Sequence, residues 1–165
     1  MEDEVLATVA ASAPRRWLGV AVMGVLGVLL IYIALAMPPQ SFLWQAFLLV
    51  MGVGSLWLAD ATRRATERVV ELTRSGLRDT GGDEITSLDN IDAVERGTFA
   101  FKPSNGFLIR LKQKRARRWQ PGLWWAFGKR VGIGGVTPGS QAKAMAQIIE
   151  MLLVERDMGQ DDQTS

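Results

Sequence analysis

The fold is decided by residues 17 to 59, which read WLGVAVMGVLGVLLIYIALAM (17–37), PPQS (38–41) and FLWQAFLLVMGVGSLWLA (42–59). The first stretch holds no Asp, Glu, Lys or Arg, and the second is nearly as apolar. As helices they would span roughly 31 and 27 Å, close to a hydrocarbon core of about 30 Å. Neither has the polar face of a helix on a soluble domain. The sequence therefore predicts a two-span transmembrane hairpin.

The connection between the two stretches is uncharged, whereas basic residues lie at both outer ends of the hairpin. These basic residues are Arg15, Arg16, Arg63, Arg64 and Arg68. Lys and Arg near span ends are retained on the cytoplasmic side. We therefore expect a multi-pass protein of a bacterial inner membrane with both termini cytoplasmic. Residues 1–16 begin acidic and precede an apolar run too long for a signal peptide, so they predict a cytoplasmic segment before a retained anchor.

Both spans contain glycines that allow close approach of helix backbones, namely Gly24 and Gly27 on the first and Gly52 and Gly54 on the second. Two uses fit this pattern. The glycines can pack the spans against each other, or one glycine face can dock the hairpin on a larger membrane complex.

Cysteine and histidine are both absent from the 165 residues. Their absence removes the thiol nucleophile, Cys-ligated metal sites, the commonest general base and the commonest transition-metal ligand. The acidic residues between Asp79 and Glu95 fit turns and a solvated strand face better than a catalytic cluster. We therefore expect no enzyme activity, no cofactor and no metal.

After the second span, residues 60–68 predict a juxtamembrane helix or linker, and from residue 69 the apolar period becomes that of strands. Turn signals at 81–83 and 102–106 separate short apolar runs. We expect strands near 69–77, with a turn or bulge at Ser75-Gly76, and near 84–88, 91–101, 107–112 and 131–133.

An amphipathic helix closes the chain, with an apolar stripe from Ala142 to Leu153, Thr137 as its cap and Pro138 at its first position. Short strands followed by one such helix predict a small α+β domain over 69–157. We expect a curved sheet or barrel closed by the helix, and a disordered tail over 158–165.

Several stretches match a family pattern: Arg68-Val-Val-Glu-Leu-Thr73, Ser75-Gly-Leu77, Gly82-Asp-Glu-Ile85 and Leu88-Asp-Asn-Ile-Asp-Ala-Val94. Together with the two-helix anchor they resemble small bacterial membrane proteins with a pleckstrin-homology-like (PH-like) domain, over roughly residues 10 to 156. The resemblance implies a binding or scaffold domain without catalysis. The chain departs from the family by lacking the aromatic before Leu-Thr and by a long Arg/Trp-rich insertion.

That insertion belongs to a stretch, 96–149, without a single acidic residue, although the whole chain carries only +2. Its candidate binding residues are Arg110, Lys112, Lys114, Arg115, Arg117, Arg118, Trp119, Trp124, Trp125, Lys129 and Arg130. They fit an anionic membrane surface, an acidic protein partner, or nucleic acid. The membrane tether favours the first and argues against the last. A simpler alternative places Trp124, Trp125 and Phe127 in the core.

Glycines 132, 134 and 135 before the last helix fit either an anion-binding loop or a tight turn. They match neither dinucleotide nor P-loop spacing, which favours the turn. The sequence as a whole predicts an accessory or assembly factor that binds a membrane-complex protein or a second copy of itself. The alternative is a sensor of anionic lipid headgroups.

Overall fold

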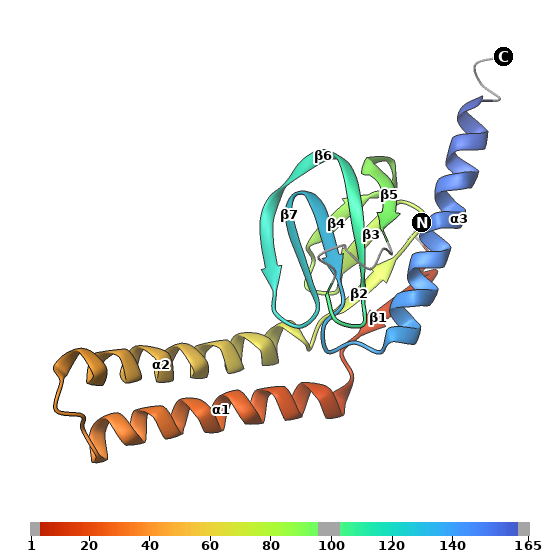
Figure 1. Cartoon of the computed structure of the whole chain (residues 1–165). Helices are drawn as coiled ribbons and strands as arrows, with labels where there is room; N and C mark the ends of the chain where they lie inside the picture. Colours follow the sequence, from red (N-terminus) through yellow and green to blue (C-terminus); the bar gives the residue numbers. More distant parts are fainter. Residues whose placement is uncertain (1–3, 96–102, 162–165) are drawn as a thin grey trace.

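The computed structural model describes residues 4–95 and 103–161. Two long helices form a hairpin that extends from a domain of short strands and a third helix (Figure 1). In chain order the elements are β1 (Ala7–Ala10), α1 (Ala13–Ala36), α2 (Phe42–Ala65), β2 (Val69–Leu72), β3 (Gly76–Asp79), β4 (Glu84–Ser87), the 3-10 turn η1 (Leu88–Asn90), β5 (Ile91–Glu95), β6 (Phe107–Gln120), β7 (Trp124–Ile133) and α3 (Gly139–Asp161).

The helices α1 and α2 confirm the two apolar stretches as a helical hairpin. Both are long and apolar enough to span a membrane, with mean hydropathy of 2.7 and 1.8 over their most apolar windows. Only 11% of each window is buried, unlike a core helix of a soluble protein. Across the connection, the Gln45 side-chain amide donates to the Ala34 carbonyl at 3.0 Å. These features support membrane association. Most of the expected juxtamembrane helix or linker, residues 60–68, is helical, because α2 continues to Ala65.

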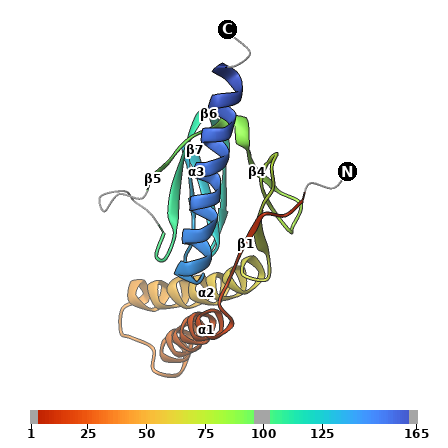
Figure 2. The ribbon, with the colours of Figure 1, turned by 90° about the vertical axis from the view of Figure 1, so that its right-hand side faces the viewer.

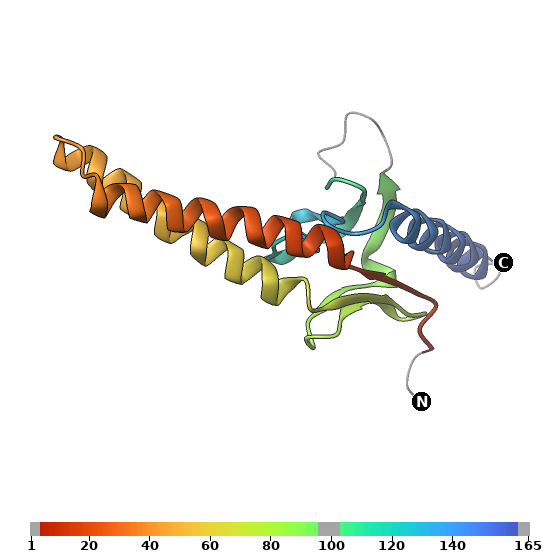
Figure 3. The same cartoon turned by 90° about the horizontal axis from the view of Figure 1, so that it is seen from below.

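A strand precedes the hairpin, which the sequence did not predict. β1 pairs antiparallel with β2, with Val9 opposite Val70 and Ala10 opposite Val69. Val9 and Val70 are fully buried. Figure 3 shows β1 leading into α1 and β2 following α2, so the hairpin is an insertion between two neighbouring strands. Because β2, the strand that pairs with β1, lies beyond both helices in the sequence, no local sequence pattern predicts this short strand.

In the described chain, β1 to β4 form one antiparallel sheet in sequence order. The expected strand over 69–77 is two strands, because the chain turns at 73–75 and re-enters the sheet at Gly76. Gly76 has φ +153°, which a side chain rarely adopts. The predicted hairpin turn at 81–83 is confirmed, with Gly82 at φ +89°.

The second sheet has the order β5-β6-β7, and its strands are longer than expected. β6 continues past residue 112 to Gln120, and β7 begins at Trp124. The turn before β6 is confirmed, with Asn105 at φ 55°. Residues 96–102, which include the expected strand positions Phe99 and Phe101, lie outside the described residues.

The expected barrel is wrong in one respect, because the two sheets do not close into one. The turn η1 separates β4 from β5 and ends the hydrogen-bonded ladder there. The α+β class itself is confirmed. Figure 2 shows α3 running along the space between the two sheets, where its residues join the buried core.

The apolar stripe predicted for the last helix is confirmed, since Ala142, Met145, Ile149, Leu152 and Leu153 are all buried in the core. The start of the helix differs from the prediction. α3 begins at Gly139, and the buried hydroxyl of Thr137 has no hydrogen-bond partner among the described residues, so Thr137 does not act as the cap.

The end of α3 also differs, because the helix continues to Asp161 and the expected tail over 158–165 is helical in its first half. Arg156 connects this outer part of the helix to η1 and β5 by hydrogen bonds. Its Nη1 donates to the carbonyls of Leu88 at 3.0 Å and Ile91 at 2.8 Å.

Candidate functional site

The predicted binding residues lie on the long antiparallel ribbon formed by β6 and β7. Trp119 is opposite Trp125 and Gln120 opposite Trp124, while the register shifts between Arg110 and Arg118. β6 has 14 residues and β7 has 10, so the extra residues of β6 form bulges and the strand arches (Figure 1). The tip of the ribbon, residues 121–123, comes back to α2.

The two faces of this ribbon differ in character. On the inner face, Trp124 and Ala126 are buried in the core. On the outer face, Trp119 is 54% exposed and Phe127 is 62% exposed. The simpler alternative of a core role for the aromatics therefore holds for Trp124 and fails for Phe127.

Trp124 is held by a buried carboxylate that the sequence did not single out. Its indole Nε1 donates to Asp79 Oδ2 at 3.2 Å. Asp79 Oδ1 accepts from the backbone N–H groups of Gly81 at 2.8 Å and Asp83 at 3.2 Å. The Asp79 side chain has no exposed surface, and its hydrogen bonds satisfy both oxygens. A signal was present, since an Asp two residues before a Gly-Gly pair often accepts hydrogen bonds from the turn backbone.

Arg68 completes this cluster from the end of α2. Its Nη1 lies 3.2 Å from Asp79 Oδ2 and 3.1 Å from Asp83 Oδ2. Burial lowers the pKa of the Arg68 guanidinium, but its hydrogen bonds and charge attraction with Asp79 and Asp83 outweigh burial and raise the pKa overall. Arg68, which the sequence placed among the cytoplasmic flanking charges, is therefore a structural link between helix and sheet.

Three predicted binding arginines are paired inside the domain. Arg115 Nη1 lies 3.7 Å from Glu84, whose carbonyl also accepts from Arg115, and Arg118 lies 3.5 Å from Asp83. Arg110 lies 2.6 Å from Asp92 and 3.4 Å from Glu95. The hydrogen bond from Arg110 lowers the pKa of Asp92, and the same bond raises the pKa of Arg110.

Other basic side chains of the ribbon point into solvent without a carboxylate. Within residues 4–95 and 103–161, no acidic group lies within 4.0 Å of Lys114, Arg117, Lys129 or Arg130. Arg117 instead lies over the ring of Phe127, 5.5 Å from its centroid. The predicted set thus divides into arginines that pair with carboxylates of the domain and cations that have no carboxylate partner among the described residues.

The tip of the ribbon contacts the end of α2. A Cβ added to Gly122 would lie 3.2 Å from Thr66 Cγ2 and 3.6 Å from Thr62 Cγ2, so the turn packs closely on the helix. Beside this contact is a groove of about 330 Å³ whose lining includes Trp57 and Arg64 of α2 and Trp119 of β6. The groove is lined by a tryptophan of α2 and one of the ribbon.

The hairpin glycines divide into two pairs. A Cβ at Gly27 would lie 2.9 Å from the Gly52 carbonyl, and one at Gly52 would lie 3.0 Å from the Gly27 carbonyl. These two residues therefore pack α1 and α2 against each other. Gly24 and Gly54 meet no atom within 4 Å, and Gly24 lies in an apolar hollow on the outside of α1.

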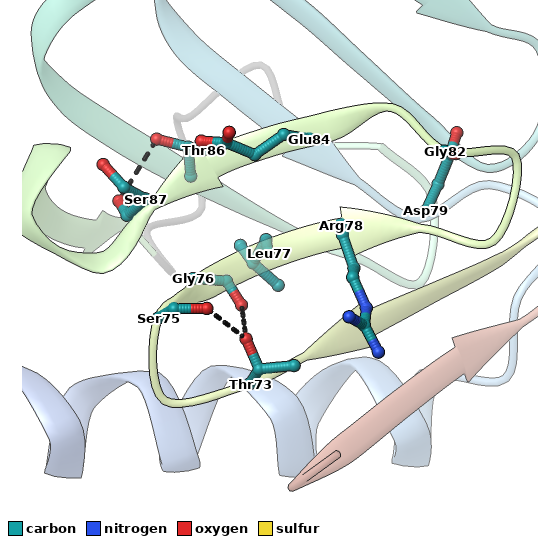
Figure 4. A pocket seen from close by; sticks show the side chains of 10 residues that line it. All are labelled: Thr73, Ser75, Gly76, Leu77, Arg78, Asp79, Gly82, Glu84, Thr86 and Ser87. Atoms are coloured by element: carbon teal, nitrogen blue, oxygen red, sulfur yellow. Dashed lines mark hydrogen bonds between the residues drawn. The ribbon is translucent and has the colours of Figure 1, made fainter. Parts of the chain in front are cut away.

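Figure 4 shows a second cleft, of about 390 Å³, along β3 and β4. The hydroxyl groups of Thr73 and Ser75 bond to each other in the loop between β2 and β3. Thr73 Oγ1 lies 2.9 Å from Ser75 Oγ and donates to the Gly76 carbonyl at 3.1 Å. Arg78, which also lines it, lies 2.9 Å from Glu71. The sequence did not predict this cleft.

The glycines before α3 make a turn. The N–H of Gly134 donates to the Leu123 carbonyl at 2.9 Å, and that of Gly135 donates to the Ser104 carbonyl at 2.8 Å. Both donors are used within the fold, so the loop has lost the N–H groups that would bind an anion.

No group of three or more acidic side chains in the described part of the chain could hold a metal ion. Comparisons with protein families, with curated proteins and with solved structures found no match to this chain. The functional proposals below therefore rest on the sequence and the geometry of the chain.

Proposed function

We propose that this chain is a non-enzymatic integral membrane protein of a bacterial inner membrane, with both termini cytoplasmic. Its PH-like domain serves as a binding or scaffold module for a membrane protein complex, in which the chain is an accessory or assembly factor. The observation that carries this proposal is the insertion of the hairpin between β1 and β2.

The insertion joins the domain to the hairpin at both helix ends. Before α1, the Ser12 N–H donates to the Val136 carbonyl at 2.9 Å, and Arg15 Nη1 donates to the Thr137 carbonyl at 3.2 Å. Arg16 Nη1 donates to the Thr66 carbonyl, which follows α2, at 3.5 Å. Two covalent connections with these contacts restrict rotation of the domain, as suits a module that presents one surface at a set orientation.

The PH-like assignment is supported by the arrangement of elements. A sheet of β1 to β4, a sheet of β5 to β7 and a C-terminal helix lying between them agree with what the sequence motifs imply. A fold of this kind supplies surfaces rather than a reaction, and it names no partner by itself.

A protein partner would find an apolar surface on the outer half of α3. Met151, Val154 and Met158 are 58%, 57% and 60% exposed and recur at helical spacing. In Figures 1 and 3 this helix lies on the side of the domain away from the hairpin. A membrane-complex subunit with a cytoplasmic part could reach this surface.

The test is purification of the tagged full chain from native membranes in a mild detergent. We expect a membrane complex in stoichiometric amount, and recovery of the chain only as a monomer or homo-oligomer would contradict the proposal. Met151→Lys with Val154→Lys is expected to release the partner, whereas Gln147→Lys on an exposed polar position of the same helix retains it. If the double variant retains the partner, the contact lies on another surface.

A lipid-surface role is the second candidate, and one observation favours it. Trp119 and Phe127 are more than half exposed on a ribbon whose Arg117 and Lys129 have no carboxylate partner in the part of the chain that the structure describes. Exposed aromatic rings beside cations suit the headgroup region of an anionic membrane.

A further inference from the structure

We propose that the outer face of the β6–β7 ribbon rests on the anionic surface of the membrane that the hairpin spans, and so fixes the tilt of the domain. This outer face consists of Arg117, Trp119, Trp125 and Phe127. The inference deepens the proposed function and rests on its membrane-spanning hairpin, but it requires no protein partner.

These four side chains share one face of the ribbon. Trp119 and Trp125 are register partners, and side chains of partners point to the same side. Arg117 lies over Phe127, which places that pair together as well. Trp124 and Ala126 alternate with them along β7 and are buried on the opposite side.

The hairpin places this face at the membrane surface. α2 has 24 residues, or about 36 Å of helix, and the hydrocarbon core is about 30 Å thick, so the last turn of α2 emerges among the headgroups. Thr62 and Thr66 of that region contact the ribbon tip at Gly122, and Trp57 and Trp119 line one groove. In Figures 1 and 3 the ribbon lies on the side of the domain from which the hairpin extends.

The chemistry of the face suits the headgroup region. Tryptophan is enriched there because its ring is apolar and its N–H is polar. The Arg117 guanidinium over an exposed Phe127 ring can contact lipid phosphates while its stem covers apolar surface. Arg64, two turns further along α2, lines the same groove as Trp57 and Trp119, so cationic and aromatic side chains occur together there.

Charge distinguishes this face from its surroundings. Arg115 and Arg118 are paired with Glu84 and Asp83, whereas Arg117 of this face and Lys129, two residues beyond Phe127 on β7, have no carboxylate partner among the described residues. A cytoplasmic leaflet rich in anionic lipid attracts such side chains within about one Debye length, or about 10 Å at 0.1 M salt. Because the hairpin already holds the domain at the bilayer, weak attraction is enough to orient it.

The test uses single cysteines, since the natural chain has none. The full chain is labelled with an environment-sensitive fluorophore at Phe127→Cys and, in a matched control, at Val154→Cys, which is similarly exposed on α3. Each protein is reconstituted in nanodiscs of phosphatidylcholine alone or with phosphatidylglycerol, containing lipids with a quencher at headgroup depth. A third label at Val28→Cys reports whether the hairpin is in the bilayer.

We expect strong quenching at position 127 in anionic nanodiscs, weaker quenching in neutral ones, and almost none at position 154. Raising the salt from about 0.01 to about 1 M shortens the Debye length from about 30 to about 3 Å and should reduce the quenching at 127 at least about twofold. Arg117→Gln with Lys129→Gln should reduce it similarly, whereas the control pair Arg74→Gln with Lys143→Gln should leave it unchanged.

Equal quenching of the labels at positions 127 and 154 by the lipid quencher, in anionic nanodiscs at low salt, would overturn the proposal. Quenching at 127 that ignores both lipid charge and salt would overturn recognition of anionic lipid. Protection of the 127 label from an aqueous quencher without quenching by lipid would overturn it in favour of a protein partner or a second copy. Absence of quenching at position 28 would instead contradict the membrane-spanning hairpin of the proposed function.

Discussion

At the scale of single residues, Asp79 links three parts of the domain: the β3–β4 turn, Arg68 after α2, and Trp124 of β7. Asp79→Asn keeps the size of the side chain but replaces one accepting oxygen by an NH₂ group, which would face groups that donate hydrogen bonds to Asp79. We expect the free energy of unfolding to fall by about 3 kcal/mol, because a buried charge pair loses one partner and buried donors lose an acceptor. Urea unfolding of the full chain in mild detergent, followed by near-UV circular dichroism, measures this.

Glu71→Gln is the matched control for that substitution, since it makes the same chemical change in a partly exposed pair with Arg78. Such pairs contribute less than about 1 kcal/mol. Equal losses in the two variants would show that the Asp79 cluster has no special structural role.

The Asp92–Arg110 pair makes a prediction about pH. The hydrogen bond from Arg110 lowers the pKa of Asp92 below the ordinary aspartate value of 3.8. The folded chain therefore holds this carboxylate ionised more strongly than the unfolded chain. Its contribution to stability is complete above the unfolded pKa and is lost as the pH falls through the folded pKa. In Arg110→Gln, the pKa of Asp92 read from its carboxyl ¹³C shift should rise toward 3.8; an unchanged value would contradict the pairing.

At the scale of elements, the hairpin packing predicts opposite results for two glycines of α1. Gly27→Val would place a Cβ 2.7 Å from Leu56 Cγ and 2.9 Å from a backbone carbonyl, so the helices must separate. We expect a loss of about 1–3 kcal/mol. A Cβ added at Gly24 meets no atom of the described residues within 4 Å, so Gly24→Val should leave stability unchanged. Thermal unfolding in detergent compares the two, and a loss at Gly24 would indicate that its face packs on another molecule.

The elements also show what a sequence pattern can predict. The hairpin helices and α3 were predictable because each repeats one apolar pattern over many residues. The outer part of β6 was not, since residues 112–118 are all polar except Ala116 where the ribbon extends past the core, and so show no alternation of apolar and polar residues. β1 was missed because four residues pair with a strand beyond the hairpin.

The candidate site was predictable in composition but not in arrangement. Sequence reasoning gathered the basic and aromatic residues into one segment, and the structure has them on the ribbon of β6 and β7. It could not separate Arg118, which pairs with Asp83, from Arg117, which lies over Phe127 on the outer face. That separation depends on strand register and bulges, which are set by contacts distant in the sequence.

At the scale of the whole molecule, the position of the hairpin implies that the domain is complete without it. Ala10 and Val69 are register partners, so the strands that flank the insertion already lie side by side. Replacing residues 13–65 by a short Gly/Ser linker keeps β1, Arg68 and the Asp79 cluster. The buried core identified in the domain contains no residue of α1 or α2. We therefore expect a water-soluble, cooperatively folded domain with dispersed amide NMR signals.

Its stability should be lower than in the full chain, because Gly122 loses its packing on Thr62. The decisive comparison is with a second form of the domain that begins at Thr66 and therefore lacks both β1 and the linker. That form leaves the β2 edge open and uncovers Val70 and Leu72, which are fully buried in the intact sheet. We expect it to aggregate or to give poorly dispersed spectra. If both forms fold equally well, β1 is a dispensable addition; if neither folds, the sheets depend on the hairpin, and the helices belong to one folding unit with the domain.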